Sequence, residues 1–232
     1  NSIQKVGFRV IFESREQYRL MDEAENIYPG EISGNYRNSL QEWPAVGDCV
    51  VGRKQVGEYG EWILIEELKE RKNVIARSED SSRGSQVLAA NVDILFVVTS
   101  ANHEFNLNRI ERYLSLSTQS SIKSVIVLNK IELTRELEAF VNSLKKRFPN
   151  VPVCAVSVVE KLNLQALKDF LMPGNTITFV GSSGVGKSSL ANYLLGYEKL
   201  HTSEIREEDS RGRHTTTHRE LILTPEKVAI ID

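Results

Sequence analysis

The sequence predicts an α/β protein in which a six-stranded, doubly wound sheet is preceded by a small all-β barrel. Three observations carry this prediction. The first 72 residues alternate short apolar runs with glycine, proline and asparagine breaks and show no convincing helix. From about residue 91, longer apolar runs alternate with helical patterns. One of those runs leads directly into a glycine-rich segment of the kind that holds phosphate groups.

The barrel prediction rests on strand-length runs in residues 1–72. Val6–Phe12, Gly47–Val51 and Glu61–Ile65 are apolar or alternating segments separated by turn residues. An OB-like barrel fits this size best, although periodicity alone does not separate it from an SH3-like barrel. Residues 73–90 include a polar stretch of small residues, Ser78–Ser85, and are expected to form a linker.

The second domain is expected over residues 91–232. Near-continuous apolar runs are typical of strands buried on both faces of a parallel sheet. Six runs predict strands: Val92–Val98, Ser124–Leu128, Val151–Ala155, Ile177–Val180, Glu220–Leu223 and Lys227–Ile231. Four segments predict helices: Leu107–Leu116, Thr134–Phe148, Leu162–Leu171 and Ser189–Leu195.

Composition excludes several classes of protein. No apolar run approaches the about 18 residues that a membrane-spanning helix needs, and no signal-peptide pattern opens the chain, so a cytoplasmic protein is expected. A net charge of −2 argues against a strongly basic nucleic-acid binder, although a local basic patch is compatible with it. Cys49 and Cys154 are too few and too isolated for a disulfide framework or a zinc site. Cys154 lies in an apolar run and is expected in the core.

The glycine-rich segment reads Gly181-Ser182-Ser183-Gly184-Val185-Gly186-Lys187-Ser188, which matches the G-x-x-x-x-G-K-S phosphate-binding loop. Glycines let several backbone N–H groups converge on one anion, and the helix that follows adds its positive end. Lys187 is expected to reach the β- and γ-phosphates, the Ser188 hydroxyl to bind Mg²⁺, and Ser189 to belong to the same nucleotide site. The strand before the segment and the helix after it favour this interpretation over a plain turn.

A second motif follows another predicted strand. Asn129-Lys130-Ile131-Glu132 resembles N-K-x-D, in which the carboxylate accepts two hydrogen bonds from the Watson–Crick edge of guanine. Here the carboxylate belongs to Glu132, one methylene longer than aspartate. The alternative is an asparagine-capped helix start with an acid in its first turn. Combined with the phosphate loop, the motif is interpreted as the base-reading element. Ser157 lies where GTPases carry an S-A-x loop beside the base; a plain serine at a strand end is the alternative.

Two segments predict the remaining metal ligands. Arg211–His218 lies between the phosphate-loop helix and the next strand, where the nucleotide-sensing segment called switch I belongs. Thr216 is the first candidate for binding Mg²⁺ there and Thr215 the second; the alternative is a solvated loop. Asp232 ends a run that looks like the strand leading into D-x-x-G, and would hold Mg²⁺ through water. The segment after it, switch II, is expected to lie in a continuation beyond residue 232.

The order of these motifs differs from that of a Ras-like GTPase. The usual order is phosphate loop, switch I, D-x-x-G, N-K-x-D and S-A-x. This chain has N-K-x-E, Ser157, phosphate loop, switch I and Asp232. The difference amounts to a circular permutation, with Pro173-Gly174-Asn175 as the turn that joins the original termini.

With these motifs, the chain resembles the circularly permuted RsgA family of ribosome-assembly GTPases, also called YjeQ. Other segments carry the resemblance as well: Gly47-Asp48, Arg71-Lys72-Asn73, Arg77, Ala90-Asn91-Val92-Asp93 and Gly212–Thr217. The resemblance implies an N-terminal OB-fold, a permuted GTPase domain and a C-terminal zinc-binding domain. The zinc domain is not found in these 232 residues, so zinc is expected only outside them. It also implies that the small ribosomal subunit and its rRNA are the partners, and that the subunit stimulates GTP hydrolysis.

The leading hypothesis is therefore a GTPase in which Lys187, the loop amides and Mg²⁺ on Ser188 and Thr216 share the developing charge. No residue is a convincing base for the attacking water, because His214 and His218 fit an exposed or RNA-facing role better. Slow turnover without the ribosomal partner, a monomeric state, and no binding to DNA or membranes are expected. Two alternatives are a nucleotide-gated RNA-binding module that uses barrel residues such as Trp43 and Arg37, and an ATP-using protein if Glu132 does not read guanine.

Overall fold

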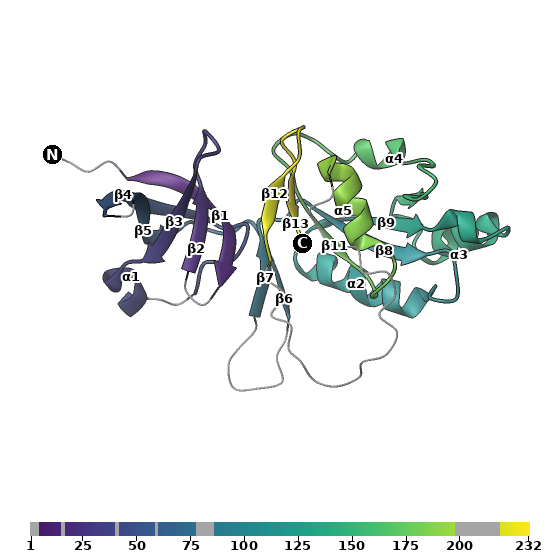
Figure 1. Cartoon of the computed structure of the whole chain (residues 1–232). Coiled ribbons are helices and arrows are strands. Elements are labelled where there is room, and N and C mark those ends of the chain that lie inside the picture. Colours follow the sequence, from purple (N-terminus) through teal and green to yellow (C-terminus); the bar gives the residue numbers. More distant parts are fainter. Residues whose placement is uncertain (1–4, 15–16, 40–41, 59, 78–85, 198–218) are drawn as a thin grey trace, which may run out of the picture. The chain divides into compact units, whose positions relative to one another are not determined.

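The computed structural model describes residues 5–14, 17–39, 42–58, 60–77, 86–197 and 219–232 (Figure 1). The chain forms two compact units. One contains the residues up to Val92 together with 219–222 and Ile231, and the other contains most of the chain from Asp93 onward. No helix of the described residues is long and apolar enough to cross a membrane.

The first unit is built around a closed five-stranded barrel with the strand order β1-β2-β3-β5-β4. All neighbouring strands pair antiparallel except β3 and β5, which are parallel. Alternate residues point inward and form a core of Phe8, Val10, Tyr18, Leu20, Ile32, Val50, Ile63 and Ile65. The OB-like barrel predicted from the sequence is confirmed. Its strands are β1 Val6–Ser14, β2 Gln17–Met21, β3 Ile27–Ile32, β4 Cys49–Gly57 and β5 Gly60–Leu68.

A short helix in the barrel was not expected from the sequence. Helix α1, Gly34–Ser39, follows β3 and begins beside Ser33. The Ser33 hydroxyl accepts a hydrogen bond from the backbone N–H of Tyr36 at 3.2 Å. Tyr36 also packs against the barrel core. Most residues of α1 are weak helix formers, so the cap and this contact stabilise a helix that propensity does not predict.

Residues 73–90, expected as a linker, contain the paired strands β6, Val74–Arg77, and β7, Gln86–Ala90. The Asn73 side chain closes the base of this pair by donating to the Val92 carbonyl at 2.8 Å and accepting from the Val92 N–H at 2.9 Å. Part of the predicted linker therefore forms paired strands. Apolar side chains and backbone pairing order them, and the polar stretch 78–85 lies outside the described residues.

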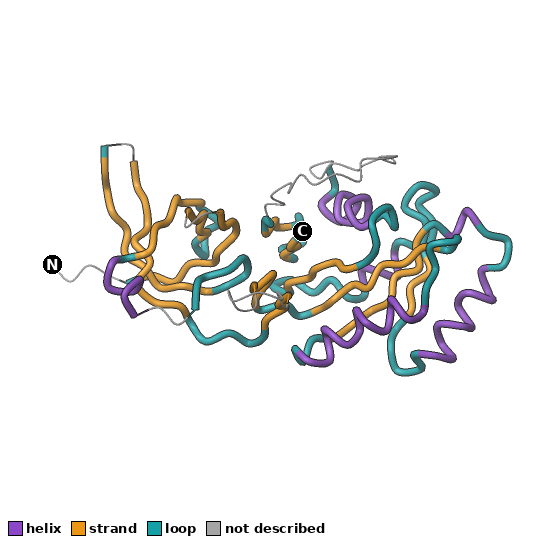
Figure 2. The backbone as a smooth tube through the Cα atoms, turned by 90° about the horizontal axis from the view of Figure 1, so that it is seen from below, coloured by secondary structure: helices purple, strands orange, loops and turns teal. Residues whose placement is uncertain are grey.

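The second unit is built around a six-stranded sheet with the order β10-β9-β8-β11-β13-β12. Strands β8 to β11 pair in parallel, and every residue of β8 is buried, as its continuous apolar run predicts. Helix α5 and helix α2 cover opposite faces of this sheet (Figure 2). The predicted six strands are confirmed as β8 Ile94–Ser100, β9 Lys123–Asn129, β10 Val153–Ala155, β11 Thr176–Val180, β12 Leu221–Leu223 and β13 Ala229–Ile231.

The helices agree with the sequence except at one position. Their bounds are α2 Leu107–Gln119, α3 Leu137–Arg147, α4 Gln165–Lys168 and α5 Lys187–Leu195, with a 3₁₀ turn η1 at Ile131–Leu133. Helix α4 is shorter than the predicted segment 162–171. Leu162 forms a bridge with Ser157, and Asn163 has a φ of 56°, so the backbone is not helical there.

The turn at residues 173–175 joins α4 to β11 and is tied to the β12–β13 pair. The Gly174 N–H donates to the Lys227 carbonyl at 2.9 Å, and the Ala229 N–H donates to the Asn175 carbonyl at 2.8 Å. Gly174 has a φ of 86°, which favours glycine. This is the turn that the sequence predicts as the junction of the permuted halves.

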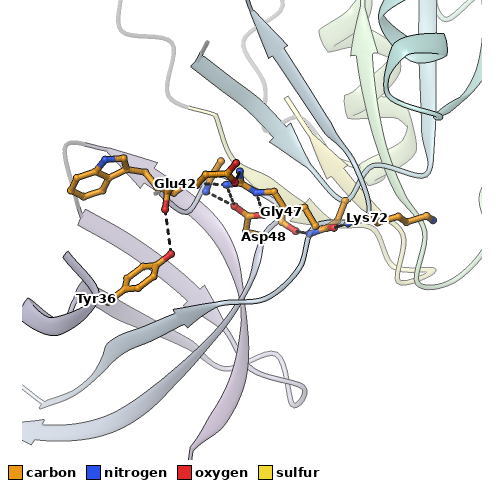
Figure 3. A network of polar contacts seen from close by, with 9 residues as sticks. Tyr36, Glu42, Gly47, Asp48 and Lys72 are labelled. Atoms are coloured by element: carbon orange, nitrogen blue, oxygen red, sulfur yellow. Dashed lines mark hydrogen bonds and ion pairs between the residues drawn. The ribbon is translucent and has the colours of Figure 1, made fainter. Parts of the chain in front are cut away.

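A polar network closes the end of the barrel unit (Figure 3). Asp48 is fully buried, and Arg71 donates to both of its carboxylate oxygens at 2.8 and 2.7 Å. Arg71 also bonds the Glu42 carboxylate and the Trp43 carbonyl. Buried charges need such partners, so this network explains why Asp48 and Arg71 are tolerated in the interior.

Candidate nucleotide-binding site

The phosphate loop lies where β11 ends and α5 begins, as the sequence predicts. Gly181, Gly184 and Gly186 have positive φ values of 156°, 78° and 97°. A Cβ atom at Gly181 would lie 2.3 Å from the Val98 carbonyl oxygen, and one at Gly186 would lie 2.2 Å from Nδ2 of Asn129. Glycine is therefore required at both ends of the loop for steric reasons.

Lys187 opens α5 and folds back over the loop. Its Nζ donates to the carbonyl oxygens of Gly181 at 3.0 Å and Ser182 at 2.7 Å. Burial lowers the pKa of Lys187, and the nearby Asp232 carboxylate partly opposes that shift. Burial likewise raises the pKa of Asp232, and Lys187 opposes it. The charges of Lys187 and Asp232 are therefore close enough to interact. Asp232, a predicted Mg²⁺ ligand, thus lies near the phosphate loop.

The predicted metal ligands beside the loop are Ser188, in the first turn of α5, and Asp232, just after β13. A hydroxyl and a carboxylate are oxygen donors of the kind that Mg²⁺ prefers, so these two residues fit that ion. Ser189, the last predicted loop residue, is half-buried in the same helical turn. Thr216 and Thr215, predicted in switch I, lie outside the described residues, as do His214 and His218.

Asn129 connects the N-K-x-E motif to the phosphate loop. It ends β9, is 3% exposed, and donates from Nδ2 to the Val185 carbonyl at 2.9 Å. Lys130 follows with a left-handed φ of 61°, and the chain then enters η1. Among the described residues, the Oδ1 of Asn129 and the Oε2 of Glu132 are buried without a hydrogen-bond partner. Such orphaned acceptors are rare in folded proteins and fit a ligand that supplies N–H donors.

Ser157 lies beside this motif but its hydroxyl is already engaged. The Ile131 N–H donates to the Val156 carbonyl at 3.4 Å, which holds the end of the β10 segment next to η1. The Ser157 side chain is fully buried and accepts from the Glu160 N–H at 3.0 Å. Its backbone pairs with Leu162 in both directions. The structure therefore gives the hydroxyl a role in shaping a turn.

Arg109 makes a contact with the loop that the sequence did not predict. It extends from the first turn of α2, and its guanidinium donates to the hydroxyl of Ser182 in the phosphate loop. The same guanidinium lies 3.5 Å from the Glu104 carboxylate. Arg109 and Ser182 are 73 positions apart, and no motif links them, so only the fold reveals the contact.

Together, the described residues form a glycine-rich loop with one lysine beside it. Ser188 and Asp232 supply two possible oxygen ligands for a metal ion, and two unpaired acceptors lie at the end of β9 and in the η1 turn that follows it. The comparisons with known proteins agree with this arrangement. The RsgA GTPase family model matches residues 68–232. The chain belongs to the RsgA GTPase family.

Relatives of this family match over most of the chain. The small ribosomal subunit biogenesis GTPase RsgA 2 of Vibrio vulnificus is 41% identical over 100% of this chain and 68% of its own length. RsgA of Methanosarcina acetivorans is 41% identical over 90% of the chain and 57% of its own length. The chain thus spans about two thirds, or somewhat less, of the relatives it matches.

Two solved structures have the same fold as this chain. YjeQ from Thermotoga maritima superposes with a TM-score of 0.76 at 25% identity, over 99% of this chain and 74% of that one. YloQ, described as a circularly permuted GTPase, gives a TM-score of 0.68 at 21% identity. The permuted order predicted from the motifs is confirmed for this RsgA-family chain.

Proposed function

We propose that the chain binds GTP and GDP with Mg²⁺ and hydrolyses GTP to GDP and phosphate as a factor in maturation of the small ribosomal subunit. The observation that carries this proposal is the link between the two motifs. Asn129 holds the phosphate loop through Val185, while its own Oδ1 and the Oε2 of Glu132 are buried without protein partners. The N–H donors on the Watson–Crick edge of guanine would pair with the Glu132 carboxylate.

The residues have distinct roles in this proposal. The loop N–H groups and Lys187 hold the phosphates, and Lys187 exchanges its bonds to the loop carbonyls for bonds to phosphate oxygens. Ser188 and Thr216, and Asp232 through water, would hold Mg²⁺, which would supply further neutralisation of phosphate charge when bound. No described residue beside the loop is assigned as a base for water, so turnover is slow without a partner.

Glu132 tests the guanine assignment. Titration of GDP, ADP and XDP against the wild-type chain and a Glu132→Asp variant measures base selectivity. We expect the wild type to prefer GDP, and Glu132→Asp to bind GDP more tightly because its shorter side chain restores the usual acceptor position. Equal affinity for ADP and GDP would contradict the assignment and favour the ATP-using alternative.

The relatives are named for small ribosomal subunit biogenesis, and we propose the small subunit and its rRNA as this chain's partners as well. We also propose a monomeric protein that acts in the cytoplasm without binding DNA or membranes; its net charge of −2 argues against binding DNA through a strongly basic surface. GTP turnover measured with and without purified small subunits tests the partner. We expect stimulation by the small subunit and none by the large subunit; equal rates with both would contradict the proposal.

A second candidate function is RNA binding by the barrel. Trp43 is 46% exposed, which is unusual for so large an apolar side chain, and Arg37 is exposed on the neighbouring helix α1. Aromatic and basic side chains of this kind stack on and neutralise single-stranded RNA. Trp43→Ala should weaken binding to the small subunit without changing GDP affinity. Unchanged subunit binding would remove this candidate.

A further inference from the structure

We propose that Arg109 is a positioning residue for nucleotide binding, and that it acts by fixing the phosphate loop through the hydroxyl of Ser182. This proposal rests on the proposed function, because it assigns a role toward the nucleotide of the same site. It adds a residue from α2 to a site that the sequence motifs place only on other segments.

Two contacts outside the phosphate loop hold Arg109 in place. Asn106 caps α2, and its side chain accepts a hydrogen bond from the Arg109 N–H at 3.0 Å. The Glu104 carboxylate lies 3.5 Å from Nη1 of Arg109. The backbone of Arg109 is thus part of a capped first turn, and a carboxylate on the preceding segment orients its charge. From this position Nη1 donates to Oγ of Ser182.

Two positively charged side chains donate hydrogen bonds to Ser182. Its carbonyl oxygen accepts from Nζ of Lys187 at 2.7 Å, while its hydroxyl accepts from Arg109. At the other end of the loop, the Val185 carbonyl accepts from Asn129 at 2.9 Å. Side chains from α2 and β9 therefore fix the loop on both sides of its exposed apex, Ser183-Gly184.

Fixing both sides has an energetic consequence. A phosphate loop must hold several N–H groups in one geometry, and ordering them during binding costs affinity. Bonds from outside the loop reduce that cost because the loop is already close to its bound form. When Lys187 leaves the Ser182 carbonyl for a phosphate, the bond from Arg109 still holds the residue. We therefore expect Arg109 to slow nucleotide release.

Two alternative roles for Arg109 lead to different results. The contact between Arg109 and Glu104 is half-exposed and long, and such ion pairs contribute little by themselves. The guanidinium could also act by long-range attraction on the phosphates, in which case Ser182 would not matter. A cycle that removes each partner separately distinguishes positioning through Ser182 from attraction by charge alone.

The experiment measures equilibrium affinity and the dissociation rate of fluorescent mant-GDP with Mg²⁺. The variants are Arg109→Ala, Arg109→Gln, Ser182→Ala and the double variant Arg109→Ala/Ser182→Ala, with Arg112→Ala on the exposed side of α2 as the matched control. We expect Arg109→Ala and Ser182→Ala each to weaken binding roughly tenfold through faster release. The double variant should be no weaker than either single variant. Arg109→Gln, which keeps a donor without charge, should retain most of the affinity, and Arg112→Ala should bind as the wild type does.

Three results would overturn the proposal. Weak binding by Arg109→Ala with normal binding by Ser182→Ala would assign the effect to charge. Additive losses in the double variant would mean that the two residues act independently. Wild-type affinity in both single variants would leave Arg109 without a role. Thermal unfolding without nucleotide checks that each variant is folded. If Arg109→Ala is not folded, Arg109→Met, which keeps the apolar stem without a hydrogen-bond donor, replaces it. Failure of the wild type to bind mant-GDP would instead reject the proposed function.

Discussion

Replacement of Gly186 by alanine should uncouple the two halves of the nucleotide site. The new Cβ would lie 2.2 Å from Nδ2 of Asn129, a distance that no relaxed structure permits. The residue also has a φ of 97°, where an L side chain is strained. The loop or Asn129 must therefore move, and the bond from Asn129 to the Val185 carbonyl is the first to be lost.

The magnitude follows from these two effects. Left-handed backbone costs a non-glycine residue about 1–2 kcal/mol. Loss of a buried hydrogen bond that leaves its partner unsatisfied costs about 1–3 kcal/mol. Together they amount to about 2–5 kcal/mol, shared between folding and binding. If the free protein relaxes to escape the strain, the whole cost appears on binding, and GDP affinity falls by roughly 30-fold to several thousandfold.

Two measurements on Gly186→Ala separate the cost to GDP binding from the cost to folding. Mant-GDP titration gives the change in binding free energy, and urea unfolding without nucleotide, followed by circular dichroism, gives the change in unfolding free energy. The sum of the two losses should fall within the range of about 2–5 kcal/mol. Asn129→Ala should reproduce the loss of the bond to Val185 without the backbone strain.

Two glycines provide matched controls. Gly184 lies in the same loop with a φ of 78°, and Gly196 ends α5 with a φ of 78°, and a Cβ at either would meet no atom within 4 Å. Gly196→Ala should lower the unfolding free energy by about 1–2 kcal/mol and leave GDP affinity unchanged. Gly184→Ala should lose less affinity than Gly186→Ala. GDP binding by Gly186→Ala within about twofold of the wild type, together with an unchanged unfolding free energy, would refute the coupling between loop and base site.

Three further predictions concern metal binding, the barrel and a buried thiol. Ser188→Ala should weaken GDP binding roughly tenfold with Mg²⁺ and not at all in EDTA, as measured by titration in both buffers. Asp48→Asn removes the buried counter-charge of the Arg71 guanidinium and leaves only the exposed Glu42 carboxylate, so urea unfolding followed by tryptophan fluorescence should show a loss of about 3–5 kcal/mol. Burial raises the pKa of Cys154 to about 11, helped by the Asp169 carboxylate, so iodoacetamide at about pH 8 should label Cys49 first. Labelling of Cys154 should rise only as the pH approaches that value or as the protein unfolds.

Each of these predictions has its own control. The same loss for Ser188→Ala in EDTA as in Mg²⁺ would exclude a metal role for its hydroxyl. Glu61→Gln breaks an exposed ion pair with Lys54 at 3.0 Å and should cost less than about 1 kcal/mol; an equal loss from Asp48→Asn would contradict the importance of burial. Rapid labelling of the folded Cys49→Ser variant at about pH 8 would show that Cys154 is more accessible than its burial indicates.

Much of the fold could be predicted because its signals are local. The uninterrupted apolar run that becomes β8 can only be a strand or helix buried on both faces, and its length and neighbours indicate a strand. The helix predicted over Leu162–Leu171 is longer than α4 because the spacing of its apolar residues fits a helix and a turn equally well. There, the backbone pairing of Leu162 with Ser157 prevails over the helical pattern. Helix α1 was missed because a single serine cap stabilises it in the context of the barrel.

The candidate site could likewise be predicted where its residues are contiguous in the sequence, but not where they come together only in the fold. The phosphate loop and the N-K-x-E motif are contiguous, so their chemistry can be read from spacing. The hydrogen bond from Asn129 to Val185 joins residues 56 positions apart, and the one from Arg109 to Ser182 joins residues 73 apart. Such contacts depend on which strands become neighbours in the sheet, and β8 lies between β9 and β11 although β10 separates those two in the chain. No pattern in one sequence specifies that.

The turn at residues 173–175 lies where the circular permutation joins the two original chain termini. In the usual order of the motifs, these positions would be the two chain termini. Here a single stretch of chain joins them, and two backbone hydrogen bonds fasten it to the β12–β13 edge. Because main-chain groups make both bonds, the fastening does not depend on which side chains occupy the turn. The junction of the permuted halves is therefore anchored by main-chain bonds to the segment that leads into β13 and Asp232.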